Sequence, residues 1–168
     1  VKMGKFKNKK VIITGGASGI GEVMVTRFCE QGAKVTFVDI ATEQSDALCA
    51  KLAGKYEFDP QFIHCDIRDV EALKAAIEQT RQQQGDIGVL INNAGALWWK
   101  NILDTPTNRY DLINNINSRG SFIFSKECIP HMLKNNGGQI INCSPPLTTL
   151  NNKLAFPYAT RFIKPPVI

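Results

Sequence analysis

Three glycines near the start of the chain are spaced to bind a phosphate group. The segment TGGASGIG, residues 14–21, follows an apolar run and opens an amphipathic pattern. In this context Gly15 permits a tight turn, Gly19 admits the close approach of a pyrophosphate, and Gly21 lets a helix pack against the preceding strand. The helix N-terminus would add amide donors and the positive end of its dipole. Because the lysine of a P-loop is missing, the segment favours a dinucleotide over ATP, and a purely structural glycine turn is the alternative.

Two aspartates follow later strand-like runs and could recognise other parts of a dinucleotide. Asp39 ends the run KVTFVD, where a carboxylate can accept hydrogen bonds from the adenosine ribose hydroxyls. It would repel a 2′-phosphate, and no arginine or lysine follows at 40–42, so the sequence favours NAD over NADP. An ordinary turn residue is the alternative for Asp39. Asp66, in HCDI, could accept the adenine amino group or cap the next helix, and both interpretations stay open.

The elements that would position these residues alternate between short strands and longer helices. Apolar, β-rich runs predict strands, and the segments between them carry apolar residues at helical spacing. This alternation predicts a doubly wound, Rossmann-like α/β domain of three layers, with a parallel sheet covered on both faces, formed by the single domain 1–168. A long helix is expected over 108–135, broken or ended near Pro130. The predicted strands cover residues 9–14, 34–39, 61–67, 87–92 and 138–143.

Composition places the chain among ordinary globular proteins. Of its 168 residues, 43% are hydrophobic and 21% are charged, which suits one domain with a proper core. The net charge of +5 comes from scattered lysines and arginines, so no nucleic-acid partner is expected. No apolar run approaches the ~20 residues that cross a bilayer, and the first residues lack a signal peptide's apolar core. Five cysteines without C-x-x-C spacing and two distant histidines predict reduced thiols, a cytoplasmic protein and no metal site.

The order of three motifs resembles the short-chain dehydrogenase/reductase family. TGGASGIG, CDI and NNAG occur at that family's spacings, and the likeness covers roughly residues 8–145. The resemblance implies that Asn92 and Asn93 satisfy backbone groups at a strand end, while Gly95 lets the cofactor approach. It also implies NAD as the cofactor. The cofactor-binding residues would be Gly15, Ser18, Gly19, Ile20, Gly21, Asp39, Asp66, Ile67, Asn93, Ala94 and Gly95.

Two further segments resemble one subgroup of that family. ALWWKNILDTP and NCSPPL are similar to hydroxysteroid dehydrogenase-like and terpenoid-alcohol dehydrogenase proteins. Trp98 and Trp99 could then border the mouth for a hydrophobic alcohol or carbonyl substrate, or cover the helix below or an oligomer surface. The family's habit predicts a homodimer or homotetramer.

The resemblance also implies which residues carry out catalysis. Asn117, in NSRG, would hold a water of the proton-relay path. Ser144 would hydrogen-bond the substrate oxygen, and Tyr158, fourteen residues further on, would exchange a proton with it. In the family a lysine four residues after the tyrosine stabilises the phenolate, but here that position is Phe162.

The missing lysine leaves three functions open. Arg161 is a planar fork rather than a flexible ammonium, and Lys164 lies round the helix next to two prolines, so neither substitutes for it. The chain is therefore an NAD(H)-dependent oxidoreductase, a truncated or degenerate member that binds NAD without turnover, or a purely structural subunit. It stops at Ile168, before the family's substrate-choosing strands, and the loss of a helix and a strand between Ala159 and Thr160 is one explanation.

Overall fold

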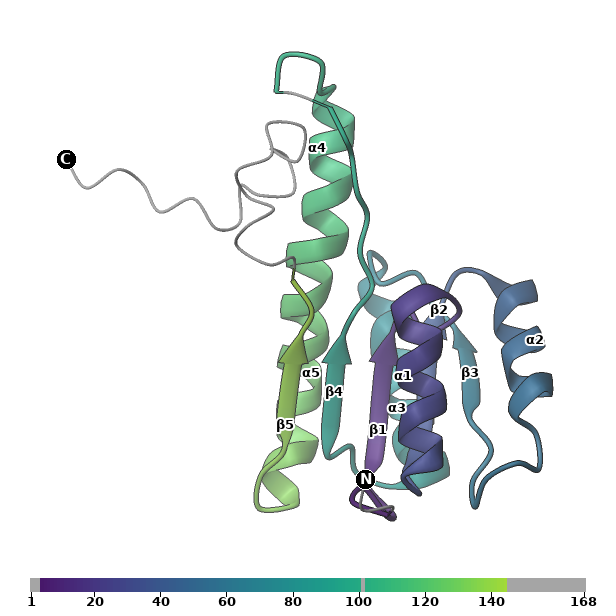
Figure 1. The fold of residues 1–168 in the computed structure, drawn as a ribbon. Coiled ribbons are helices and arrows are strands. Elements are labelled where there is room, and N and C mark those ends of the chain that lie inside the picture. The colour runs from purple at the N-terminus through teal and green to yellow at the C-terminus, as the bar shows by residue number, and fades with distance from the viewer. Residues whose placement is uncertain (1–3, 101, 145–168) are drawn as a thin grey trace.

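The computed structural model describes residues 4–100 and 102–144, which form a parallel sheet with helices on both faces (Figure 1). The described strands are β1 (Lys10–Thr14), β2 (Lys34–Asp39), β3 (Gln61–His64), β4 (Val89–Asn92) and β5 (Gln139–Asn142). Their order across the sheet is β3-β2-β1-β4-β5, and every neighbouring pair runs parallel. The direction of winding therefore reverses at β1, which is where open α/β sheets form a crevice at the carboxyl ends of their strands.

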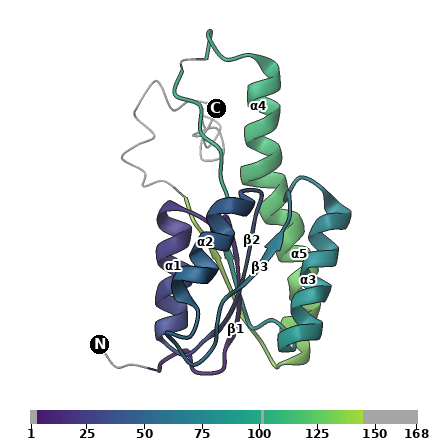
Figure 2. The same cartoon turned by 90° about the vertical axis from the view of Figure 1, so that its right-hand side faces the viewer.

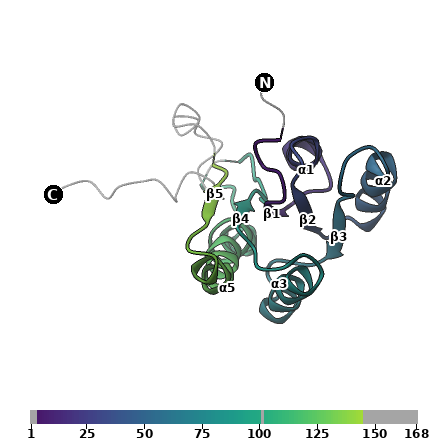
Figure 3. The same cartoon turned by 90° about the horizontal axis from the view of Figure 1, so that it is seen from below.

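The helices form two layers, one on each face of the sheet (Figures 2 and 3). One face carries α1 (Gly19–Glu30) and α2 (Thr42–Leu52). The other carries α3 (Val70–Gln84) and α5 (Ser121–Lys134). The predicted doubly wound, three-layer α/β fold is confirmed. Among the described residues, no helix is both long and apolar enough to cross a membrane.

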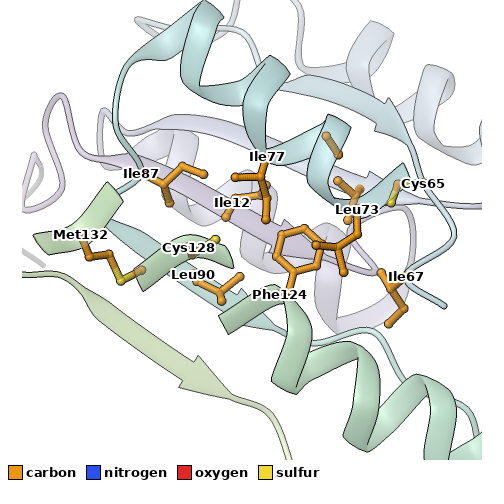
Figure 4. Packing of buried hydrophobic residues seen from close by; sticks show 12 residues of the cluster. Ile12, Cys65, Ile67, Leu73, Ile77, Ile87, Leu90, Phe124, Cys128 and Met132 are labelled. Carbon is orange, nitrogen blue, oxygen red and sulfur yellow. The ribbon is translucent and has the colours of Figure 1, made fainter. Parts of the chain in front are cut away.

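Alternating side chains of β1 supply the two cores that hold the layers together. Val11 and Ile13 are fully buried against the α1 and α2 layer, whereas Ile12 is fully buried on the opposite face. Successive strand residues point to opposite faces, so a strand covered on both sides must be apolar throughout. On the α3 and α5 side, Phe124 fills the centre of the cluster (Figure 4). Burying one such side chain stabilises the fold by about 1.5–3 kcal/mol.

The long helix differs from the prediction in where it becomes irregular. Helix α4 (Thr107–Asn114) leads into a π-helical segment, η1 (Asn115–Gly120), which leads directly into α5. The expected break near Pro130 is wrong, because α5 continues through that residue to Lys134. Pro130 lies on the exposed side of the helix, so water can satisfy the carbonyl that loses its hydrogen bond. Above the sheet, α4 projects past the ends of the strands (Figure 1).

Candidate functional site

A cleft of about 540 Å³ lies at the carboxyl ends of β1, β2 and β4. Nearly all of the predicted cofactor-binding residues line it, although they come from segments far apart in the sequence. Gly19, Ile20 and Gly21 are not part of the lining. The lining residues are Gly15, Ser18, Val38, Asp39, Ile40, Cys65, Asp66, Ile67, Arg68, Asn93, Ala94, Gly95, Leu112 and Ile116.

The glycines of residues 14–21 differ in what they allow. A Cβ at Gly21 would lie 1.9 Å from the carbonyl oxygen of Gly15, so this position lets the start of α1 pack onto the loop. A Cβ at Gly15 would lie 2.7 Å from the Cα of Ala94, and Gly15 also has a φ of +67°. Gly19, at φ +56°, has no heavy atom within 4 Å of such a Cβ, which leaves open space in front of it. Two of the glycines therefore permit close packing, and the third faces free space.

The N-terminus of α1 offers backbone donors that the described residues do not use. Ser18 is the N-cap, but its side chain makes no capping hydrogen bond. Among the described residues, no acceptor takes the N–H of Gly19 or Ile20. A helix N-terminus with free N–H groups beside open space is suited to bind an anion such as a pyrophosphate.

The carboxylate of Asp39 links two neighbouring segments. Its Oδ2 accepts a hydrogen bond from the backbone N–H of Ala17, at 3.0 Å, and its Oδ1 accepts one from the N–H of Ala41, also at 3.0 Å. The second bond is the turn role left open for this residue, whereas the bond to Ala17 was not expected. A carboxylate has about four lone-pair directions, so each oxygen can still accept one ribose hydroxyl. The two roles of Asp39 are therefore compatible.

Asp66 is paired with Arg68 rather than capping a helix. The N-cap of α3 is Asp69, whose carboxylate accepts the N–H groups of Glu71 and Ala72, so the capping alternative for Asp66 is wrong. Instead, the Arg68 guanidinium contacts both carboxylate oxygens of Asp66 and holds the pKa of that carboxyl below its ordinary value. Sequence reasoning missed Arg68, and the only available signal was its place two residues after Asp66.

The Asn-Asn-Ala-Gly turn attaches β4 to its neighbours. Asn93 donates from Nδ2 to the carbonyl oxygens of Gly15, at 2.9 Å, and Thr14, at 3.2 Å. In return, the Thr14 hydroxyl accepts the backbone N–H groups of Asn93 and Ala94, both at 3.0 Å. Asn92 points toward α5 and β5, where its Nδ2 donates to the Ser125 hydroxyl at 3.0 Å. These bonds fix the wall of the cleft next to the glycine loop, and Thr14 is a residue that sequence reasoning missed.

Asn117 is buried in the π-helical segment and faces the loop that follows β4. Its Oδ1 accepts the N–H of Ala96 at 2.8 Å, and its Nδ2 donates to the Ala96 carbonyl at 3.0 Å. The side chain thus orders the loop, and the carbonyl of Asn117 accepts the Ser121 hydroxyl at 3.0 Å. Any water of a proton relay would therefore have to share groups that already have protein partners.

The remaining predicted residues lie at the edge of the described chain or beyond it. Ser144 is exposed, two residues after the end of β5. Tyr158 and Phe162 lie outside the described residues, as do Ala159 and Thr160.

The two tryptophans that follow the Asn-Asn-Ala-Gly turn differ in their surroundings. Trp98 is partly buried, and the Arg109 guanidinium lies 5.0 Å from the centre of its ring. Trp99 is 53% exposed. One tryptophan therefore packs against α4, while the other stays open to solvent.

Comparison with known proteins places this arrangement in a family. The model of the short chain dehydrogenase family matches residues 9–160, and the chain belongs to that family. A Serratia marcescens short-chain dehydrogenase/reductase mutant has a similar structure, with a TM-score of 0.84 and 28% sequence identity, over 92% of this chain and 62% of that one. The resemblance inferred from the motifs is confirmed.

Curated relatives include both sugar dehydrogenases and hydroxysteroid dehydrogenase-like proteins. A probable galactose dehydrogenase from Rhizobium meliloti is 38% identical over 146 residues, which is 87% of this chain and 57% of that protein. D-xylose 1-dehydrogenase from Caulobacter vibrioides is 40% identical over 82% of this chain and 53% of its own length. Hydroxysteroid dehydrogenase-like protein 2 of Mus musculus is 35% identical over 86% of this chain and 31% of its own length. The chain thus spans between about a third and just over half of these relatives.

Proposed function

We propose that the chain is the cofactor-binding part of an NAD(H)-dependent oxidoreductase that interconverts an alcohol and its carbonyl compound. The observation that carries this proposal is the cleft at the carboxyl ends of β1, β2 and β4, where free backbone N–H groups and a carboxylate lie at opposite positions of one site. Membership of the short chain dehydrogenase family supports the reaction class.

The residues that line the cleft fit a dinucleotide without a 2′-phosphate. The open space before Gly19 and the N–H groups of α1 would hold the pyrophosphate, and Asp39 would accept the ribose hydroxyls. Arg68 is the sole cation among the lining residues, and its guanidinium is paired with Asp66. A 2′-phosphate beside Asp39 would therefore meet a negative charge without a free positive partner, which favours NAD over NADP.

Catalysis would use residues on the same side of the sheet. When bound, the nicotinamide supplies hydride transfer. Ser144 would donate a hydrogen bond to the substrate oxygen, and Tyr158 would exchange the proton with it. Asn117 would act by holding the loop at Ala96 in place.

A second candidate is binding of NAD without turnover, which is favoured by Phe162. Tyrosine has an ordinary pKa near 10, so it is a poor base at neutral pH unless a nearby cation stabilises its phenolate. Phe162 supplies no such charge at the position of the family's lysine.

We propose a small hydrophobic substrate, because apolar side chains follow the Asn-Asn-Ala-Gly turn. Leu97, Trp99 and Ile102 are each more than half exposed on the loop that leads to α4. The sugar dehydrogenases among the relatives make an aldose the competing substrate class. A cytoplasmic homodimer or homotetramer remains part of the proposal.

Fluorescence titration with NADH and NADPH tests the cofactor assignment. We expect saturable binding of NADH and weaker binding of NADPH, and equal affinities would refute the role of Asp39. The absence of any binding would leave only the structural-subunit function.

Turnover separates the two candidates. Hydrophobic alcohols and aldoses should be assayed with the Tyr158→Phe variant and with Tyr110→Phe as the matched control, since Tyr110 lies exposed on α4. Loss of activity in the first variant alone supports the enzyme. Tight NADH binding without turnover, followed by a gain of activity in Phe162→Lys, would support the degenerate member.

A further inference from the structure

The pair formed by Asp66 and Arg68 occupies one end of the cleft. Both residues line the cleft, and they lie directly after β3, next to the end of β2 that carries Asp39. The side chains are 33% and 47% exposed, so this pair stands at the surface of the site rather than in the core. Asp66 is also the residue whose carboxylate was expected to accept the adenine amino group.

The contacts within the pair use the accepting capacity of the carboxylate. Oδ1 of Asp66 accepts the backbone N–H of Arg68 at 2.9 Å and the side-chain Nε of Arg68 at 2.9 Å. Oδ2 is contacted by Nε at 2.9 Å and by Nη2 at 2.5 Å. A carboxylate has about four lone-pair directions, so no direction remains for a further donor while Arg68 stays in place.

The backbone around Arg68 is held as well, which keeps the guanidinium where it is. Its N–H is bound by Asp66, and its carbonyl accepts a hydrogen bond from Nη1 of Arg119, on η1, at 3.2 Å. Both peptide groups of Arg68 therefore have partners, and the side chain needs to span only a two-residue loop to reach Asp66.

We propose that Arg68 is a specificity-determining residue of the base subsite, because it keeps Asp66 from recognising the exocyclic amino group of adenine. This inference rests on the proposed function. The subsite then accepts dinucleotides whose base carries either an amino or an oxo group at that position. The Nη1 of Arg68 has no partner among the described residues and can donate to an oxo group.

Binding of NADH and of reduced nicotinamide hypoxanthine dinucleotide, in which the amino group is replaced by oxygen, tests the proposal. Fluorescence titration of the unaltered protein should give dissociation constants within about threefold of each other. Arg68→Ala frees the carboxylate and should raise the preference for NADH by at least about fivefold. Arg68→Lys, which keeps the charge but cannot form the two-toothed contact, should give an intermediate preference.

The matched control is Lys74→Ala. It removes one positive charge from an exposed ion pair with Glu71 on α3, and Lys74 does not line the cleft, so the ratio of the two affinities should stay unchanged. A preference of the unaltered protein for NADH above about threefold, or no rise in Arg68→Ala, overturns the role of Arg68 while leaving the proposed function intact. Failure of both dinucleotides to bind overturns the proposed function together with this inference.

Discussion

Replacing Asp39 by alanine should destabilise the fold as well as alter the choice of cofactor. The substitution removes both acceptors that hold Ala17 and Ala41. Ala17 is only 4% exposed, so its N–H loses its partner where water has little access, whereas Ala41 is partly exposed and water can replace the lost bond. A hydrogen bond to a charged group contributes about 1.5–3 kcal/mol, and an exposed one less, so we expect a loss of about 2–4 kcal/mol.

Asparagine at position 39 should have an intermediate effect. It keeps one oxygen acceptor, but its amide nitrogen faces the second backbone N–H, so about half of the loss is expected, or about 1–2 kcal/mol. Since the carboxylate charge is gone in both variants, NADPH should bind better relative to NADH in both. Exchange of cofactor preference and loss of stability are thus coupled at this residue.

Urea unfolding followed by circular dichroism measures the stability of the two variants, and fluorescence titration measures the ratio of cofactor affinities. Asp46→Ala is the matched control, because it removes an exposed carboxylate from α2 and should change stability by less than about 0.5 kcal/mol. An Asp39→Ala protein as stable as this control would refute the reasoning, since the bonds to Ala17 and Ala41 would then contribute nothing.

Three further outcomes are expected. Gly21→Ala should cost more than about 2 kcal/mol in urea unfolding because its Cβ would meet a loop carbonyl at 1.9 Å, whereas Gly19→Ala, with nothing near, should cost about 1–2 kcal/mol from its positive φ alone. Asn117→Ala removes two hydrogen bonds from a side chain that is 3% exposed and should cost about 2 kcal/mol; an unchanged urea midpoint would contradict that role. Burial raises the pKa of Cys29 and of Cys128 from 9.0 to about 12, so the folded state holds these protons longer than the unfolded state. Stability should therefore fall as the pH rises from 9.0 towards 12, and replacing either thiol by alanine should flatten that part of the pH profile.

The layers of the fold could be predicted because burial on both faces leaves a strong pattern in the sequence. The run that became β1 is apolar throughout, and the structure divides it between two cores. Pro130 was misread because a proline signals a lost hydrogen bond, but the sequence does not tell whether the freed carbonyl faces water. The π-helical segment at Asn117 has no period of its own that could reveal it.

The site was predictable in position but not in its pairings. Strand-end residues such as Asp39 and Asn93 reach one edge because all the strands are parallel, which the sequence already indicates. Which donor a carboxylate meets depends on side-chain directions after folding. The sequence therefore suggested adenine as the partner of Asp66, while the structure gives that carboxylate to Arg68.

The glycine loop owes its shape to its neighbours more than to its own residues. The N–H of Gly15 donates to the carbonyl of Val38 at 2.8 Å, the N–H of Ala17 reaches Asp39, and Asn93 binds the carbonyl of Gly15. Strands β2 and β4 thus hold the loop from both sides, and they use groups that face away from the N-terminus of α1. The donors at Gly19 are left without described partners because the protein fixes the loop elsewhere. A site whose donors are held in place before an anion arrives avoids the cost of ordering them on binding, which is the condition under which backbone N–H groups bind phosphate well.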